Sequence, residues 1–105
     1  SVDDFAVNFT QALAGLSADD SVLVLADIVG GSPLTTAASV LADMGKLDSA
    51  VILGGLNLTM GLTGLVMKDI LDGKELAQAI LSEATAALQE FEVVSDAADE
   101  DEDDI

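Results

Sequence analysis

The sequence predicts an α/β fold, an open parallel sheet with helices on both faces. Two short runs, residues 22–26 and 50–53, are apolar throughout, which is typical of strands that helices cover on both sides. Each run leads into a glycine pair, a polar residue and then a stretch with helical periodicity. A strand, a crossover helix and a second strand form a right-handed βαβ unit, so both strands should end at the same sheet edge.

The composition limits the possible functions. A chain of 105 residues can form one domain with a modest core. It carries 20 acidic residues against three lysines and no arginine, a formal net charge of −17. This charge disfavours binding to nucleic acid or to an anionic membrane surface, and it makes a basic protein the more natural partner.

Histidine and cysteine are both missing from the sequence. Without cysteine there is no disulfide framework, which fits a reducing compartment. Familiar zinc sites, Ser–His–Asp triads and phosphohistidine chemistry cannot be assembled from this chain alone, so we expect neither a metal nor a cofactor. Residues 1–16 also lack the basic start and apolar block of a signal peptide.

Four helices are expected around the two strands. The first covers residues 1–16, with Asp3 and Asp4 in its first turn, where acids are favourable. The second covers residues 33–44 and should end at Gly45. Both have an apolar face at the helical period, formed by Phe5, Phe9, Ala12, Leu13 and Leu16 in the first helix, and by Leu34, Ala37, Ala38, Leu41 and Met44 in the second.

The second half of the chain is expected to add helices at residues 59–71 and 74–91. Residues 90–94 could instead form a short edge strand. The uncharged stretch 50–67 is long enough to span a membrane, but Asn57, two threonines and four glycines interrupt it. Residues 1–94 should therefore form the domain, and residues 95–105 an acidic disordered tail or the start of a linker.

The turn after the first strand is a candidate anion site. Ser32 is expected to cap the next helix, and Pro33 to take its first position, where a missing N–H costs nothing. A helix amino terminus behind Gly30 and Gly31 offers free N–H groups and the positive end of the helix dipole to a phosphate. No Gly-Lys-Ser/Thr follows, so this is not a Walker loop.

Two polar residues follow the predicted strands directly. Asp27 closes the first strand and Asn57 follows the second, so both should lie on one rim of the sheet, where ligands bind in open α/β folds. Structural alternatives stay open for both residues. Asp27 could cap a backbone N–H, and Asn57 could be the N-cap of the next helix.

Two segments resemble the IIA domain of mannose-family sugar phosphotransferase systems. They are Leu-Ala-Asp-Ile-Val-Gly-Gly-Ser-Pro at 25–33 and Val-Ile-Leu-Gly-Gly-Leu-Asn-Leu-Thr-Met at 51–60, and the likeness runs over about residues 2–94. The resemblance implies a cytoplasmic, generally dimeric α/β domain. Such a domain takes a phosphoryl group from the phosphocarrier protein HPr onto a histidine and passes it to the IIB domain. From there the group reaches the incoming sugar at the membrane components IIC and IID.

The resemblance also implies roles for single residues. Asp27 would orient the active histidine, the turn of Gly30, Gly31 and Ser32 would hold the phosphoryl oxygens, and Asn57 and Thr59 would line the pocket. Family members begin with a strand, a turn that holds the histidine, a helix and a second strand, and the sequence before the first helix here contains none of these. This chain alone is therefore not expected to carry phosphate on histidine.

Dimerisation is expected to stabilise so thin a sheet, and the resemblance implies exchange of a terminal strand, for which residues 90–94 are the candidate. Two other functions stay open. One is a non-catalytic dimerisation or interaction module of the same fold. The other is a small flavodoxin-like domain that binds a phosphorylated ligand at the turn of residues 30–32.

Overall fold

The computed structural model describes residues 1–94, and it confirms the α/β class. The elements follow the chain in the order α1 (Val2–Ala12), β1 (Leu23–Leu25), α2 (Ser32–Asp43), β2 (Val51–Leu53), α3 (Leu58–Met67) and α4 (Gly73–Ala86). The predicted acidic tail or linker, residues 95–105, lies outside the described residues.

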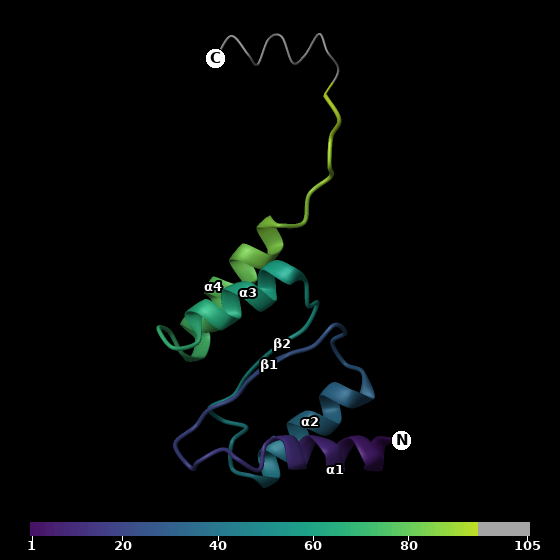
Figure 1. Ribbon diagram of the computed structural model, residues 1–105, viewed down its shortest axis with the longest axis vertical. Coiled ribbons are helices and arrows are strands. Elements are labelled where there is room, and N and C mark those ends of the chain that lie inside the picture. Colours follow the sequence, from purple (N-terminus) through teal and green to yellow (C-terminus); the bar gives the residue numbers. More distant parts are fainter. Residues whose placement is uncertain (95–105) are drawn as a thin grey trace.

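The two strands pair in parallel, as the crossover helix between them predicts. Leu23 lies opposite Val51, and Leu25 lies opposite Leu53. Figure 1 shows the strands between two helix pairs, α3 with α4 on one side and α1 with α2 on the other. Within residues 1–94 the sheet has these two strands only. One helix pair lies on each of its faces.

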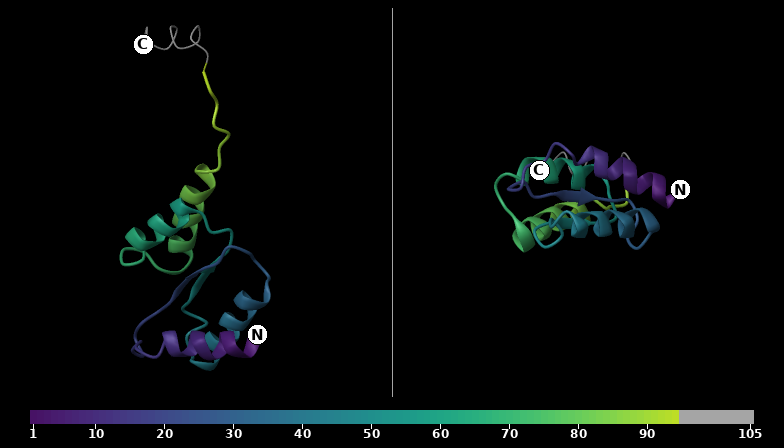
Figure 2. Two further views of the ribbon diagram at one scale, coloured as in Figure 1. Left: turned by 45° about the vertical axis from the view of Figure 1, so that its right-hand side comes forward. Right: turned by 90° about the horizontal axis from the view of Figure 1, so that it is seen from below.

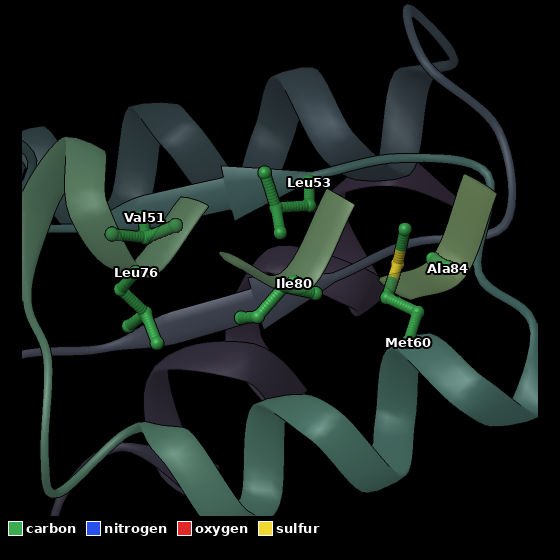
Figure 3. Close-up of a cluster of buried hydrophobic side chains, with 6 residues drawn as sticks. All are labelled: Val51, Leu53, Met60, Leu76, Ile80 and Ala84. Carbon is green, nitrogen blue, oxygen red and sulfur yellow. The ribbon is translucent and has the colours of Figure 1, made fainter. Parts of the chain in front are cut away.

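The main core lies between the strands and the α3–α4 pair. Alternation along each strand turns the side chains of residues 23, 25, 51 and 53 to this face. Gly64 lets α3 approach β1 closely, because a Cβ there would lie 3.1 Å from Cδ2 of Leu23. The buried cluster, drawn in Figure 3, comprises Val51, Leu53, Met60, Leu76, Ile80 and Ala84.

The other face is covered less completely. α2 contributes two buried side chains, Ala37 and Leu41. α1 packs against α2, but no residue of α1 is buried in the described part of the chain. Its apolar face is instead organised by Phe5 and Phe9, whose rings are stacked with centroids 5.7 Å apart. α1 is thus the less firmly anchored helix of its pair.

Three predicted helices end at least four residues earlier than expected. α3 ends at Met67 rather than at residue 71. α1 ends at Ala12, and residues 13–16 form a tighter turn in which Leu16 N–H donates to the Leu13 carbonyl. α4 ends at Ala86 rather than at residue 91. The two acids Glu90 and Glu92 follow it, and negative charge at a helix carboxyl end opposes the dipole.

Residues 90–94 form no strand within the described chain, so that prediction is wrong for a single copy. Figures 1 and 2 show this segment leaving the body of the molecule after α4. The segment lies away from both strands, so its backbone groups have no neighbouring strand with which to form ladder hydrogen bonds.

Lys46 anchors the connection between α1 and β1, which the sequence did not predict. The residue is only 7% exposed and follows Gly45, whose φ of 71° ends α2. Its Nζ donates to the carbonyl of Ser17 (2.8 Å) and to the carbonyl of Asp20 (2.5 Å). One buried ammonium therefore ties the loop before β1 to the end of α2.

Lys46→Met should lower the free energy of unfolding by about 1–2 kcal/mol, because the apolar stem is kept while two carbonyls lose a charged donor. Urea denaturation followed by far-UV circular dichroism measures this, since the chain has no Trp or Tyr for fluorescence. Lys74→Met is the matched control on an exposed lysine. Equal midpoints for the two variants would contradict the anchoring role.

Asp20 makes the stability of this loop depend on pH. The pKa of its carboxyl lies below the ordinary value of 3.8 because it accepts the Ser17 N–H at 2.9 Å, and the Lys46 charge adds to this. A lowered folded-state pKa stabilises the fold above the ordinary value, and this contribution is lost as pH falls through the folded-state pKa.

Asp20→Asn should therefore lower Tm slightly near neutral pH and leave it equal to that of the unsubstituted chain at pH values well below 3.8. Calorimetric melts across this pH range, with the neighbouring exposed Asp19→Asn as control, measure the difference. A Tm gap that stays constant with pH would assign the effect to shape rather than to charge.

Candidate functional site

The loops after β1 and β2 are joined by backbone hydrogen bonds at the carboxyl edge of the sheet. Ala26 N–H donates to the Leu53 carbonyl, and Leu56 N–H donates to the Ala26 carbonyl, each at 2.9 Å. Gly55 N–H donates to the carbonyl of Asp27 at 3.2 Å. The structure therefore holds the backbone of Asp27 against the loop that leads to Asn57, on one rim.

A close approach at Gly54 adds to this junction. A Cβ on Gly54 would overlap Cγ2 of Val29 and lie 3.3 Å from the Val29 nitrogen. The turn after β1 thus lies directly on the loop after β2. Gly30 and Gly55 have φ angles of 85° and 81°, which favour glycine and let both loops turn sharply at this point.

Gly54→Ala should displace the turn at Val29 and lower the free energy of unfolding by about 1–3 kcal/mol through overpacking. Amide chemical shifts of residues 27–31 and urea midpoints measure the two effects. Gly15→Ala is the matched control, because its Cβ would meet no atom within 4 Å. Unchanged shifts at residues 27–31 would show that the two loops are not in contact.

α2 starts one position earlier than predicted. Its N-cap is Gly31, in extended conformation, and no side chain caps this end within the described residues. The Gly31 carbonyl already accepts Thr35 N–H (3.1 Å) and the Thr35 hydroxyl (3.2 Å). Ser32 is therefore the first helical residue and not the cap, and Pro33 is the second.

Because Gly31 and not Ser32 is the N-cap, the predicted anion site has more hydrogen-bond donors without a side-chain acceptor than expected. The exposed Ser32 hydroxyl is not used for capping, and the first-turn N–H groups of α2 have no side-chain acceptor in the described chain. The helix dipole makes this end positive. Ser32 also lines a hollow of about 300 Å³ between the amino ends of α1 and α2, together with Ser1, Val2, Phe5, Pro33 and Thr36.

Asn57 has the structural role that was left open as an alternative. Its Oδ1 accepts Met60 N–H at 2.8 Å and caps α3, while its Nδ2 donates to the Ala84 carbonyl at 3.0 Å. The second bond ties α3 to α4 and has no local sequence signal. Thr59 lies half-buried in the first turn of α3. Asn57 borders a different hollow from Ser32.

The charge at this rim limits what can bind. Asp27 is exposed, and the chain has a net charge of −17. A phosphate brought alone to the rim would meet a carboxylate with no intervening cation, which is unfavourable. An anion is therefore favoured at this rim only when a cationic group offsets the Asp27 charge.

Two further observations apply to residues 1–94. No three carboxylate, histidine or cysteine groups there come close enough together to hold a metal ion. Every helix in this part of the chain is too short or too polar to cross a bilayer.

These features define a parallel α/β domain with a glycine-rich polar turn at the carboxyl edge of its sheet. The family model described as the PTS system fructose IIA component matches residues 1–81. The chain therefore belongs to this family of phosphotransferase-system IIA components, and the resemblance based on residues 25–33 and 51–60 is confirmed.

A solved structure supports the fold. The crystal structure of phosphotransferase system component EIIA from Streptococcus agalactiae is similar, with a TM-score of 0.71 and 20% sequence identity. The likeness covers 87% of this chain and 68% of that one. No curated protein sequence matches this chain. At this identity the solved structure shows a shared fold alone.

Proposed function

We propose that this chain serves in the phosphoryl-carrier IIA component of a mannose-family sugar phosphotransferase system, relaying phosphate from HPr to IIB during sugar uptake in the cytoplasm. Family membership supports the phosphotransfer role. The observation that carries the proposal is the amino end of α2, which no side chain caps and which follows the turn after Asp27, whose backbone is hydrogen-bonded to the loop after β2. Phosphoryl transfer needs mainly positioning and charge stabilisation, which such a rim can supply.

The chemistry follows from an imidazole placed between these groups. The Asp27 carboxylate would accept the N–H of one ring nitrogen, which fixes the tautomer and leaves the other nitrogen free to attack phosphorus. A nitrogen–phosphorus bond forms as the bond from phosphorus to HPr breaks. The N–H groups of Gly31 and Ser32 and the Ser32 hydroxyl would then bind the phosphoryl oxygens, while Asp27 balances the imidazolium charge.

The acceptor imidazole has to come from outside these 105 residues, because the sequence contains no histidine. The experiment compares the chain alone with the chain joined to a family-type strand, histidine turn, helix and strand at its amino end. Phosphorylated HPr should modify the longer protein, on histidine, and leave the 105-residue chain unmodified. Absence of transfer to the longer protein would contradict the proposal.

A second candidate is a non-catalytic interaction module of the same fold. It predicts that the longer protein binds HPr and IIB but takes up no phosphate. A flavodoxin-like domain for free phosphorylated ligands is disfavoured by the unscreened Asp27 carboxylate and the net charge.

We also propose a homodimer in which residues 90–94 pair with a strand of a second copy. Phe91 and Val93 are 90% and 85% exposed and alternate along the segment, as in a strand with one apolar face. Removing residues 90–94 should then reduce the molecular mass measured in solution from that of a dimer to that of a monomer.

Contacts with the membrane components would be indirect, through IIB, and no nucleic acid partner is expected at this charge.

A further inference from the structure

The side-chain amide of Asn57 connects the ends of two helices. Its Oδ1 accepts the Met60 N–H at 2.8 Å, at the amino end of α3. Its Nδ2 donates to the Ala84 carbonyl at 3.0 Å, in the last turn of α4. Met60 and Ala84 both belong to the buried cluster drawn in Figure 3, so the amide is held between two well-packed turns.

The Ala84 carbonyl lies beyond the regular hydrogen bonding of α4. In a longer helix it would accept the N–H of Leu88, but that N–H donates to the Thr85 carbonyl instead, at 3.1 Å. Ala84 is 4% exposed, and a buried carbonyl without a donor is costly. The amide oxygen meets the positive end of α3 and the amide nitrogen meets the negative end of α4. Asparagine therefore suits this place better than aspartate, whose carboxylate cannot donate.

Asn57 also ends the loop that supports Asp27. In this loop the Gly55 N–H donates to the Asp27 carbonyl at 3.2 Å, and the Leu56 N–H donates to the Ala26 carbonyl at 2.9 Å. The loop begins with a glycine pair directly after β2, so its backbone is free to move unless both ends are held. β2 holds one end of the loop, and Asn57 holds the other.

We propose that Asn57 is a positioning residue for phosphoryl transfer, which fixes the loop after β2 and, through that loop, the backbone of Asp27. The inference rests on the proposed function, in which the Asp27 carboxylate orients the acceptor imidazole. Such a carboxylate has to be held to within about 0.5 Å of its working position. Asn57 thus acts through the loop, without contact with phosphate or histidine, and not by lining the pocket as the resemblance implies.

Two substitutions separate this role from helix capping. Asn57→Ser keeps an oxygen that can cap α3, but the shorter side chain does not reach the Ala84 carbonyl. Gln89→Ala is the matched control, because Gln89 Nε2 donates to the Ala86 carbonyl at 3.0 Å. This bond is also made by a side-chain amide in the last turn of α4, but it has no connection to the loop after β2.

Amide hydrogen exchange of the 105-residue chain tests the link directly. In Asn57→Ser, exchange at Gly55 should accelerate about tenfold relative to exchange at Val51, whose N–H donates to the Val22 carbonyl at the opposite end of the sheet. The Gln89 control should leave this ratio unchanged. Equal acceleration at both amides in Asn57→Ser would overturn the proposal, since it would show a loss of overall stability only.

Phosphoryl transfer to the chain joined to a histidine-bearing unit, the histidine-completed domain, gives the second test. Asn57→Ser should slow transfer at saturating HPr about fivefold and leave the binding of HPr unchanged. In a domain that already carries Asp27→Asn, the same substitution should have no further effect, because Asn57 acts through Asp27. Equal slowing with and without the Asp27 carboxylate would overturn the proposal. If the unsubstituted completed domain takes up no phosphate, the proposed function fails, and the exchange ratio still decides whether Asn57 fixes the loop.

Discussion

Replacing Asp27 with asparagine should slow phosphoryl transfer from HPr to the histidine-completed domain by about 100-fold. Asparagine keeps the size of the side chain and one acceptor oxygen, but it is neutral and its amide can present a donor to the ring instead. It therefore fixes the imidazole tautomer poorly and no longer balances the imidazolium charge. A 100-fold loss corresponds to about 2.7 kcal/mol of transition-state stabilisation.

Rapid-quench measurement of acid-labile phosphate on the completed domain gives this rate, and titration of HPr gives its binding separately. Binding should be nearly unchanged, because the role proposed for Asp27 is toward the histidine and not toward HPr. Asp43→Asn, at the far end of α2, is the matched control on an exposed carboxylate. If the Asp27 and Asp43 variants transfer at the same rate, Asp27 has no part in the mechanism.

The strands and the shared rim could be predicted because their signals are local and strong. Uniformly apolar runs at 22–26 and 50–53 contain β1 and β2, and the βαβ rule alone fixes their parallel pairing. Parallel pairing then requires that the loops carrying Asp27 and Asn57 start from one edge, and the backbone hydrogen bonds between these loops confirm it.

The start of α2 could not be predicted to the residue, because neighbouring positions compete for the cap. Serine is normally a better N-cap than glycine, and with Ser32 as the cap Pro33 takes the first helical position, where proline is most frequent. The extended backbone of Gly31 decides the matter, since its carbonyl already accepts the first helical N–H. The residue preferences therefore predict the position of the turn correctly but assign the N-cap to Ser32 instead of Gly31.

Contacts between distant residues had no sequence signal at all. Lys46 lies 26 and 29 positions from its two carbonyl acceptors, and an isolated lysine after a glycine normally indicates a solvated helix end. The Asn57 amide likewise donates to Ala84, 27 residues away. These bonds depend on which loops the fold brings together, so only the three-dimensional structure identifies them.

Ile80→Ala should lower the free energy of unfolding by about 2–5 kcal/mol, a large share of the stability of a domain this small. Ile80 is 0% exposed and belongs to the cluster that joins α4 to β2 and α3, so the cavity cannot easily collapse. Ile80→Val should cost only about 0.5–1.5 kcal/mol, and the exposed Gln78→Ala on the same helix almost nothing. Urea denaturation by far-UV circular dichroism ranks the three variants, and a loss for Ile80→Ala no greater than for Gln78→Ala would mean that α4 does not hold the sheet together.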